Sequence, residues 1–114
     1  IKFFYRNTSL EENLLITSVK LIGKKSPKQE VEKKQYAMVE RKKKSQPSQI
    51  KTCGSTFKNP KNKKAWELIK ESDCESFEVG DAKISKKHCN FFINTGKATA
   101  KELESLINKV KDTV

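Results

Sequence analysis

The sequence is poor in arginine and has no closely paired cysteines, and each of these absences argues against a class of function. Only Arg6 and Arg41 are arginines among the 25 basic residues, whereas nucleic-acid-binding proteins usually use arginine forks together with aromatic side chains for stacking. The three cysteines include no CxxC pair, which argues against a disulfide framework or a zinc ribbon. We therefore expect reduced thiols, no metal site and no nucleic-acid partner.

Long apolar runs and glycine-rich phosphate loops are also missing. No stretch approaches the roughly 18 apolar residues of a membrane span, so we expect no membrane partner. There is no GxGxxG motif, no P-loop and no GxSxG elbow. The single histidine, His88, could activate Ser55 if the fold brought them together, but no acid that would orient the imidazole is evident.

What the sequence has in excess is lysine, and the excess is unevenly placed. The net charge is +11, and the basic residues are concentrated in residues 1–64, whereas residues 65–114 are nearly balanced. Such asymmetry favours a polyanionic partner, which could be a phosphorylated ligand, a nucleic acid or a membrane surface. A genome-wide codon bias toward lysine would give the same composition.

Local patterns predict a small α+β protein of about one domain. The expected elements are two extended strands within residues 1–22 with a turn at residues 7–13, helices at residues 27–44, 63–72 and from Thr99 onward, and strands at residues 77–80 and 89–94. The last helix has the clearest signals, because Thr99 and Glu102 form a capping box ahead of a core-facing apolar stripe. Residues 45–60 are expected to be a long loop and residues 81–85 a turn-rich segment. Trp66 is expected in the core, and the alternative is that it forms a platform for a ligand.

Two strands alone are only marginally stable. We therefore expect residues 1–25 to be the last strands of a sheet that begins before residue 1, and residues 26–114 to form a separate α+β domain. The absence of an initial methionine favours the same interpretation, in which the chain is a piece of a longer protein.

The stretch Cys53–Pro60 brings several kinds of polar side chain together within a few residues. Gly54 permits a bend and Pro60 ends any regular ladder. Between them, Ser55, Lys58 and Asn59 offer a hydroxyl, an ammonium and an amide. These groups suit an anionic or sugar-like ligand.

The same stretch resembles the GSxFKNP signature of the UDP-N-acetylenolpyruvoylglucosamine reductases. Further stretches resemble motifs of that family in the same order, namely Tyr5-Arg6-Asn7-Thr8, Lys44-Ser45-Gln46-Pro47, Ala65-Trp66-Glu67-Leu68-Ile69, Gly80–Asn94 and Ala98-Thr99-Ala100. The sequence departs from the family pattern at Trp66, where a small residue is usual, and at Asp81, where a second glycine is usual.

The resemblance implies a fragment of a cytoplasmic bacterial oxidoreductase of peptidoglycan synthesis, and hence of cell-wall formation, cell shape and cell division. Such an enzyme uses NADPH and FAD to convert UDP-N-acetylglucosamine enolpyruvate into UDP-N-acetylmuramate. The resemblance further implies that residues 1–25 are the last strands of the FAD-binding domain, most of which precedes residue 1. It also implies that a catalytic glutamate follows residue 114. We therefore expect residues 26–114 to be a truncated C-terminal substrate-binding domain with no cofactor-binding residue of its own. We also expect the fragment to be a monomer and to be inactive alone.

The resemblance also implies roles for single residues. Ser55 matches the proton donor, and a neutral hydroxyl suits that role because the carbanion or enolate it protonates is strongly basic. Tyr5, Asn59 and His88 match substrate-side positions, and Lys58 is a further substrate-binding candidate. The alternative from another class is a non-catalytic remnant, or a basic binding module that keeps the same fold.

Overall fold

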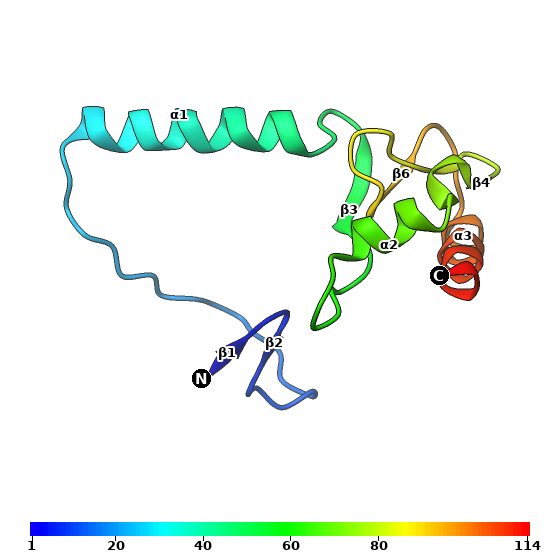
Figure 1. Ribbon diagram of the computed structural model, residues 1–114. Coiled ribbons are helices and arrows are strands. Elements are labelled where there is room, and N and C mark those ends of the chain that lie inside the picture. Colours follow the sequence, from blue (N-terminus) through cyan, green and yellow to red (C-terminus); the bar gives the residue numbers. More distant parts are fainter. The chain divides into compact units, whose positions relative to one another are not determined.

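The computed structural model describes residues 1–114 and divides them into two units, Ile1–Gln35 and Tyr36–Val114. Figure 1 shows the short strands of the first unit in blue and the helices and sheet of the second unit in green to red.

The first unit contains a short antiparallel hairpin. Strand β1 (Phe3–Phe4) pairs with β2 (Asn7–Thr8) across a turn formed by Tyr5 and Arg6. The prediction that Asn7 and Thr8 form the turn is wrong, because Arg6 adopts the left-handed backbone conformation that the tight turn needs, with φ of 52°.

The strand expected after that turn, within residues 14–22, is not formed. Residues 14–27 have no regular structure, and the apolar side chains of Leu15, Leu21 and Ile22 are exposed. A two-stranded hairpin gives these side chains no sheet face on which to pack.

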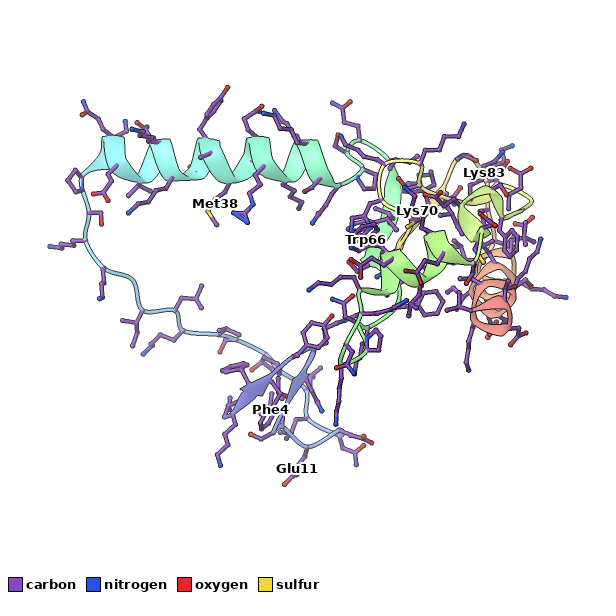
Figure 2. All side chains as sticks on the ribbon, viewed as in Figure 1. Phe4, Glu11, Met38, Trp66, Lys70 and Lys83 are labelled. Carbon is purple, nitrogen blue, oxygen red and sulfur yellow. The ribbon has the colours of Figure 1, made fainter.

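Helix α1 (Lys28–Ser45) agrees with the predicted helix to within a residue or so. It begins directly after Pro27, whose carbonyl accepts the N–H groups of Glu30 and Val31. No side chain of α1 is buried, and Met38 projects from it with 72% exposure (Figure 2). Ion pairs one turn apart, such as Lys34 with Glu30 at 2.6 Å, stabilise such a helix by a few tenths of a kcal/mol each.

The second unit is built on a four-stranded antiparallel sheet. The order in space is β3 (Lys51–Ser55), β6 (Phe91–Asn94), β5 (Ala82–Ile84) and β4 (Glu78–Val79). Helix α2 (Ala65–Glu71), the 3-10 helix η1 (Cys74–Ser76) and helix α3 (Ala100–Thr113) complete the unit. The predicted α+β class is therefore confirmed.

Two strands lie where the sequence predicts irregular structure. Strand β3 lies in the middle of the loop predicted at residues 45–60, and β5 lies within the turn-rich segment predicted at residues 81–85. Strand β5 pairs with β4 across a turn at Gly80 and Asp81, where Gly80 has a φ of 55°. Strand β3 is made of polar and small residues, and β5 is only three residues long, so neither sequence gives a clear strand signal. Each strand is ordered by its pairing with neighbouring strands.

The core lies between the sheet and the two C-terminal helices. Its most deeply buried large side chains are Ile69 of α2, Leu106 and Val110 of α3, and Cys74 of η1. The apolar stripe of the last helix is predicted to consist of Leu103, Leu106, Ile107, Val110 and Val114. It is confirmed in its centre, where Leu106 and Val110 are buried, whereas Val114 is 51% exposed. The prediction that Trp66 lies in the core is wrong, because its side chain is 40% exposed, and Figure 2 shows it with Lys70 on α2.

Candidate functional site

The candidate site begins with an irregularity at the end of β3. Thr52 stands opposite Ile93 of β6, but Ser55 stands opposite Phe91, so β3 contains one residue more than its partner. Such a β-bulge re-aims the side chains that follow it. Ser55 is the first residue after the bulge to regain the ladder, and its side chain is on the exposed side of the strand.

Two features hold the bulge in place. Gly54 has a φ of 86°, a conformation that side chains with a Cβ disfavour. The Thr52 hydroxyl donates a hydrogen bond to the Phe92 carbonyl at 2.7 Å and accepts one from the Gly54 N–H at 3.2 Å. The bulge is therefore bonded to β6 at the point where its register shifts.

Asn90 holds the segment that follows Ser55. Its side-chain carbonyl accepts the Phe57 N–H, and its side-chain amide donates to the Phe57 carbonyl, both at 2.9 Å. The Asn90 backbone carbonyl also accepts the Thr56 N–H at 2.8 Å. We call the two side-chain bonds the Asn90–Phe57 pair.

His88 lies on the loop before β6 and is tied to the same asparagine. Its Nδ1 accepts the N–H of Asn90 at 3.3 Å. In a neutral imidazole an accepting Nδ1 leaves the proton on Nε2. The ring packs edge-on against Phe91 with 4.8 Å between centroids. The structure thus links the loop of His88 to the Ser55 segment through Asn90.

His88 also lines a polar hollow of about 320 Å³. The hollow is bordered by Trp66 and Lys70 of α2 and by Lys86 and Lys87 of the β5–β6 loop. Cys89 also lines the hollow, and its thiol donates to the Trp66 carbonyl at 3.0 Å. Burial is the main cause that raises the pKa of Cys89, so this thiol stays protonated and is a poor nucleophile.

Asn59 and Lys58 lie between β3 and α2. The Asn59 side-chain carbonyl accepts the Ala65 N–H at 2.9 Å and so satisfies one free donor of the first turn of α2. Asn59 also borders a hollow of about 370 Å³ that is rich in lysine. Lys58 lies instead beside an apolar pocket of about 180 Å³ between α2 and α3.

Tyr5 belongs to the turn of the hairpin in the first unit, where it is 61% exposed. Of the five predicted site residues, the structure therefore gathers Ser55, Lys58 and Asn59 on one segment. His88 is joined to that segment through Asn90, and Tyr5 is in a separate unit.

Asn90 is the residue that the sequence interpretation missed. A single asparagine that directly precedes an apolar strand was the available signal, because a buried amide needs hydrogen-bond partners. That signal does not say which backbone groups the amide contacts.

The residues present do not form a recognisable site for a dinucleotide cofactor or a metal. Gly23, Gly54, Gly80 and Gly96 stand apart, and none belongs to a glycine-rich loop at a helix N-terminus. No group of three or more histidine, cysteine or acidic side chains is placed to hold a metal ion. No helix has both the length and the apolar composition that crossing a membrane requires.

Comparison with known proteins shows which family shares this sequence and fold. The family model for the UDP-N-acetylenolpyruvoylglucosamine reductase, C-terminal domain, matches residues 46–114. The chain belongs to this reductase family. The matched range contains Ser55, Lys58, Asn59, His88 and Asn90.

Curated relatives and a solved structure agree with the family model. A UDP-N-acetylenolpyruvoylglucosamine reductase of Wolbachia is 48% identical over 98% of this chain. One of Bradyrhizobium is 38% identical over the whole of this chain, which is 37% of the length of that enzyme. The crystal structure of the Thermus caldophilus reductase is similar over 80% of this chain, with a TM-score of 0.69 and 40% identity, and the match covers 34% of that chain. The chain spans 38% of the length of the Wolbachia relative.

Proposed function

We propose that this chain is the substrate-binding part of a UDP-N-acetylenolpyruvoylglucosamine reductase and that Ser55 donates the proton in its reaction. Membership of the reductase family supports the enzyme class. The observation that carries the residue assignment is the position of Ser55, between the β3 bulge and the segment bonded to Asn90.

The proposed substrate is the enolpyruvyl ether of UDP-N-acetylglucosamine, and the product is the lactyl ether. FAD, reduced by NADPH, would supply a hydride to C3 of the enolpyruvyl group. The residues described here form no glycine-rich cofactor loop, so we assign flavin binding to parts of the enzyme that correspond to the rest of the relatives.

Ser55 would deliver the proton to C2. Hydride addition leaves a strongly basic carbanion or enolate, so even a hydroxyl of high pKa transfers its proton downhill and remains protonated at working pH. A donor of this kind must be placed accurately, since orientation governs the rate of a proton transfer between bound groups. The fixed backbone on both sides of Ser55 suits that requirement.

The remaining candidates would hold the nucleotide-sugar. Asn59 lies at the lysine-rich hollow with Lys61 and Lys64, and the cations there would attract the diphosphate. His88, with its proton on Nε2, would donate a hydrogen bond to a substrate oxygen. Tyr5 would also contact the substrate, and Lys58 would add a further positive charge at the edge of the site.

The test is a pair of variants in the complete reductase, Ser55→Ala and, as a control for loss of an exposed hydroxyl, Ser48→Ala. NADPH-driven bleaching of the flavin absorbance and its recovery on adding the enolpyruvyl substrate are followed separately by stopped flow. We expect Ser55→Ala to leave the rate of the first step unchanged and to slow the second step by ~100-fold or more. Ser48→Ala should leave both rates unchanged. Normal turnover of Ser55→Ala would contradict the assignment.

A further inference from the structure

We infer that Asn90 is a positioning residue, which sets the location of Ser55 through the backbone of Thr56 and Phe57. This inference rests on the proposed function of Ser55. Asn90 is 3% exposed, and both polar atoms of its side chain are engaged by one residue, Phe57.

The Asn90–Phe57 pair requires an amide. Its two bonds run in opposite directions, so the side chain must donate and accept at the same time. Asparagine does both with a short and nearly rigid side chain, whereas an ionised aspartate only accepts and a glutamine is one methylene longer. The pair therefore fixes both the rotamer of Asn90 and the peptide groups on either side of Phe57.

The pair acts close to Ser55. Before Ser55, the bulge is bonded to β6 through the Thr52 hydroxyl. After Ser55, the N–H groups of the next two residues are bonded to the backbone and side-chain carbonyls of Asn90. Ser55 thus sits between two fixed points, and removing one of them lets its Oγ move.

The ring of Phe57 gives the segment a second attachment. It meets Phe92 of β6 edge-on, with 5.8 Å between ring centroids. This apolar contact does not depend on Asn90, so loss of the Asn90–Phe57 pair should loosen the segment rather than release it. A displacement of about 1 Å is enough to slow a positioned reaction by ~100-fold.

Asn94 provides a matched control at the other end of β6, because Asn90 directly precedes that strand and Asn94 is its last residue. Its side-chain carbonyl accepts the N–H groups of Gly96 and Ala98, and its amide donates to the Ala98 carbonyl at 3.1 Å. These bonds are of the same kind as those of Asn90 but hold the turn that leads to α3. A purely structural role for Asn90 predicts that the two asparagines behave alike.

The experiment compares Asn90→Ala and Asn94→Ala in the complete reductase. Urea midpoints report stability, and kcat and KM for the nucleotide-sugar are measured where each variant is folded. We expect the urea midpoints of both variants to fall. The kcat of Asn90→Ala should fall by ~10–100-fold, while the reduction of its flavin by NADPH is unchanged. The kcat of Asn94→Ala should stay within ~2-fold of the parent value. Equal kcat values for the two variants would overturn the inference.

Aspartate substitutions keep the inference testable if the alanine variants do not fold. In the variant Asn90→Asp, the protonated carboxyl could restore both bonds of the pair, with its O–H donating to the Phe57 carbonyl, whereas the ionised form could not. We expect kcat of Asn90→Asp, relative to the parent enzyme, to rise as pH falls. A ratio that does not change with pH, or that matches the ratio for Asn94→Asp, would overturn the inference.

The experiments distinguish a failure of the proposed function from a failure of this inference. If Ser55→Ala turns over normally, the proton-donor assignment is wrong and the positioning role falls with it. If Ser55→Ala is inactive while Asn90→Ala has the kcat of Asn94→Ala, the proposed function stands and only the role of Asn90 is wrong.

Discussion

Ser55 stands opposite Phe91 in the ladder between β3 and β6, although Thr52 stands opposite Ile93. The extra residue of β3 is accommodated by the left-handed backbone of Gly54. The bulge and the placement of Ser55 are therefore one structural feature, and a change at Gly54 should be felt at both.

Substitution of Gly54 by alanine tests the bulge. A Cβ at this position would meet no atom within 4 Å, so the cost comes from the positive φ alone. We expect Gly54→Ala to lower the free energy of unfolding by ~1–2 kcal/mol, measured by urea denaturation. Gly54→Asn should recover part of this loss, because asparagine tolerates the left-handed region.

The asparagine variant is the decisive comparison for that prediction. If Gly54→Asn is as unstable as Gly54→Ala, the loss comes from something other than the backbone conformation. In the complete reductase, we also expect Gly54→Ala to lower kcat more than it raises KM, since the displaced group is Ser55 rather than the groups assigned to substrate binding.

The capping box of α3 supports a second prediction. The Thr99 hydroxyl accepts the Glu102 N–H at 3.2 Å, and the Glu102 carboxylate accepts the Thr99 N–H at 2.7 Å. We expect Thr99→Ala to cost ~1 kcal/mol of unfolding free energy and Thr99→Ser to cost only a few tenths. Equal losses in the alanine and serine variants would show that the methyl group, and not the hydroxyl, stabilises the helix.

This capping box also shows which parts of the fold the sequence predicts well. Helix α3 is predictable with its cap and the centre of its core face because those signals are local, a few residues apart. Strand β6 is predictable for the same reason, from the apolar run Phe91–Ile93. Strands β3 and β5 are not, because they are mostly polar or small and depend on pairing with β6.

The residues of the candidate site also divide into those that local sequence signals predict and those that they do not. Ser55, Lys58 and Asn59 share one segment, so a local motif is enough to select them together. The Asn90–Phe57 pair joins residues that are 33 apart in the chain, and no local pattern encodes which backbone groups a buried amide will contact. Trp66 is misplaced by the sequence pattern because an apolar side chain on a short helix does not reveal which face of that helix is exposed.

The two buried cysteines lead to a final prediction, on alkaline pH. Desolvation by burial is the main cause that raises the pKa of both Cys74 and Cys89, with repulsion from Asp73 and Glu75 respectively adding to it. Because the pKa of each folded-state thiol lies above its unfolded value, the stabilisation is complete below about pH 8.5 and is lost as pH rises through the folded-state pKa. We expect the urea midpoint to fall above about pH 9.

The decline of the midpoint with pH should be shallower in the double variant Cys74→Ala/Cys89→Ala. The control Cys53→Ala, which changes an exposed thiol, should leave the decline unaltered. An equally steep decline in the double variant would assign the alkaline loss to other groups.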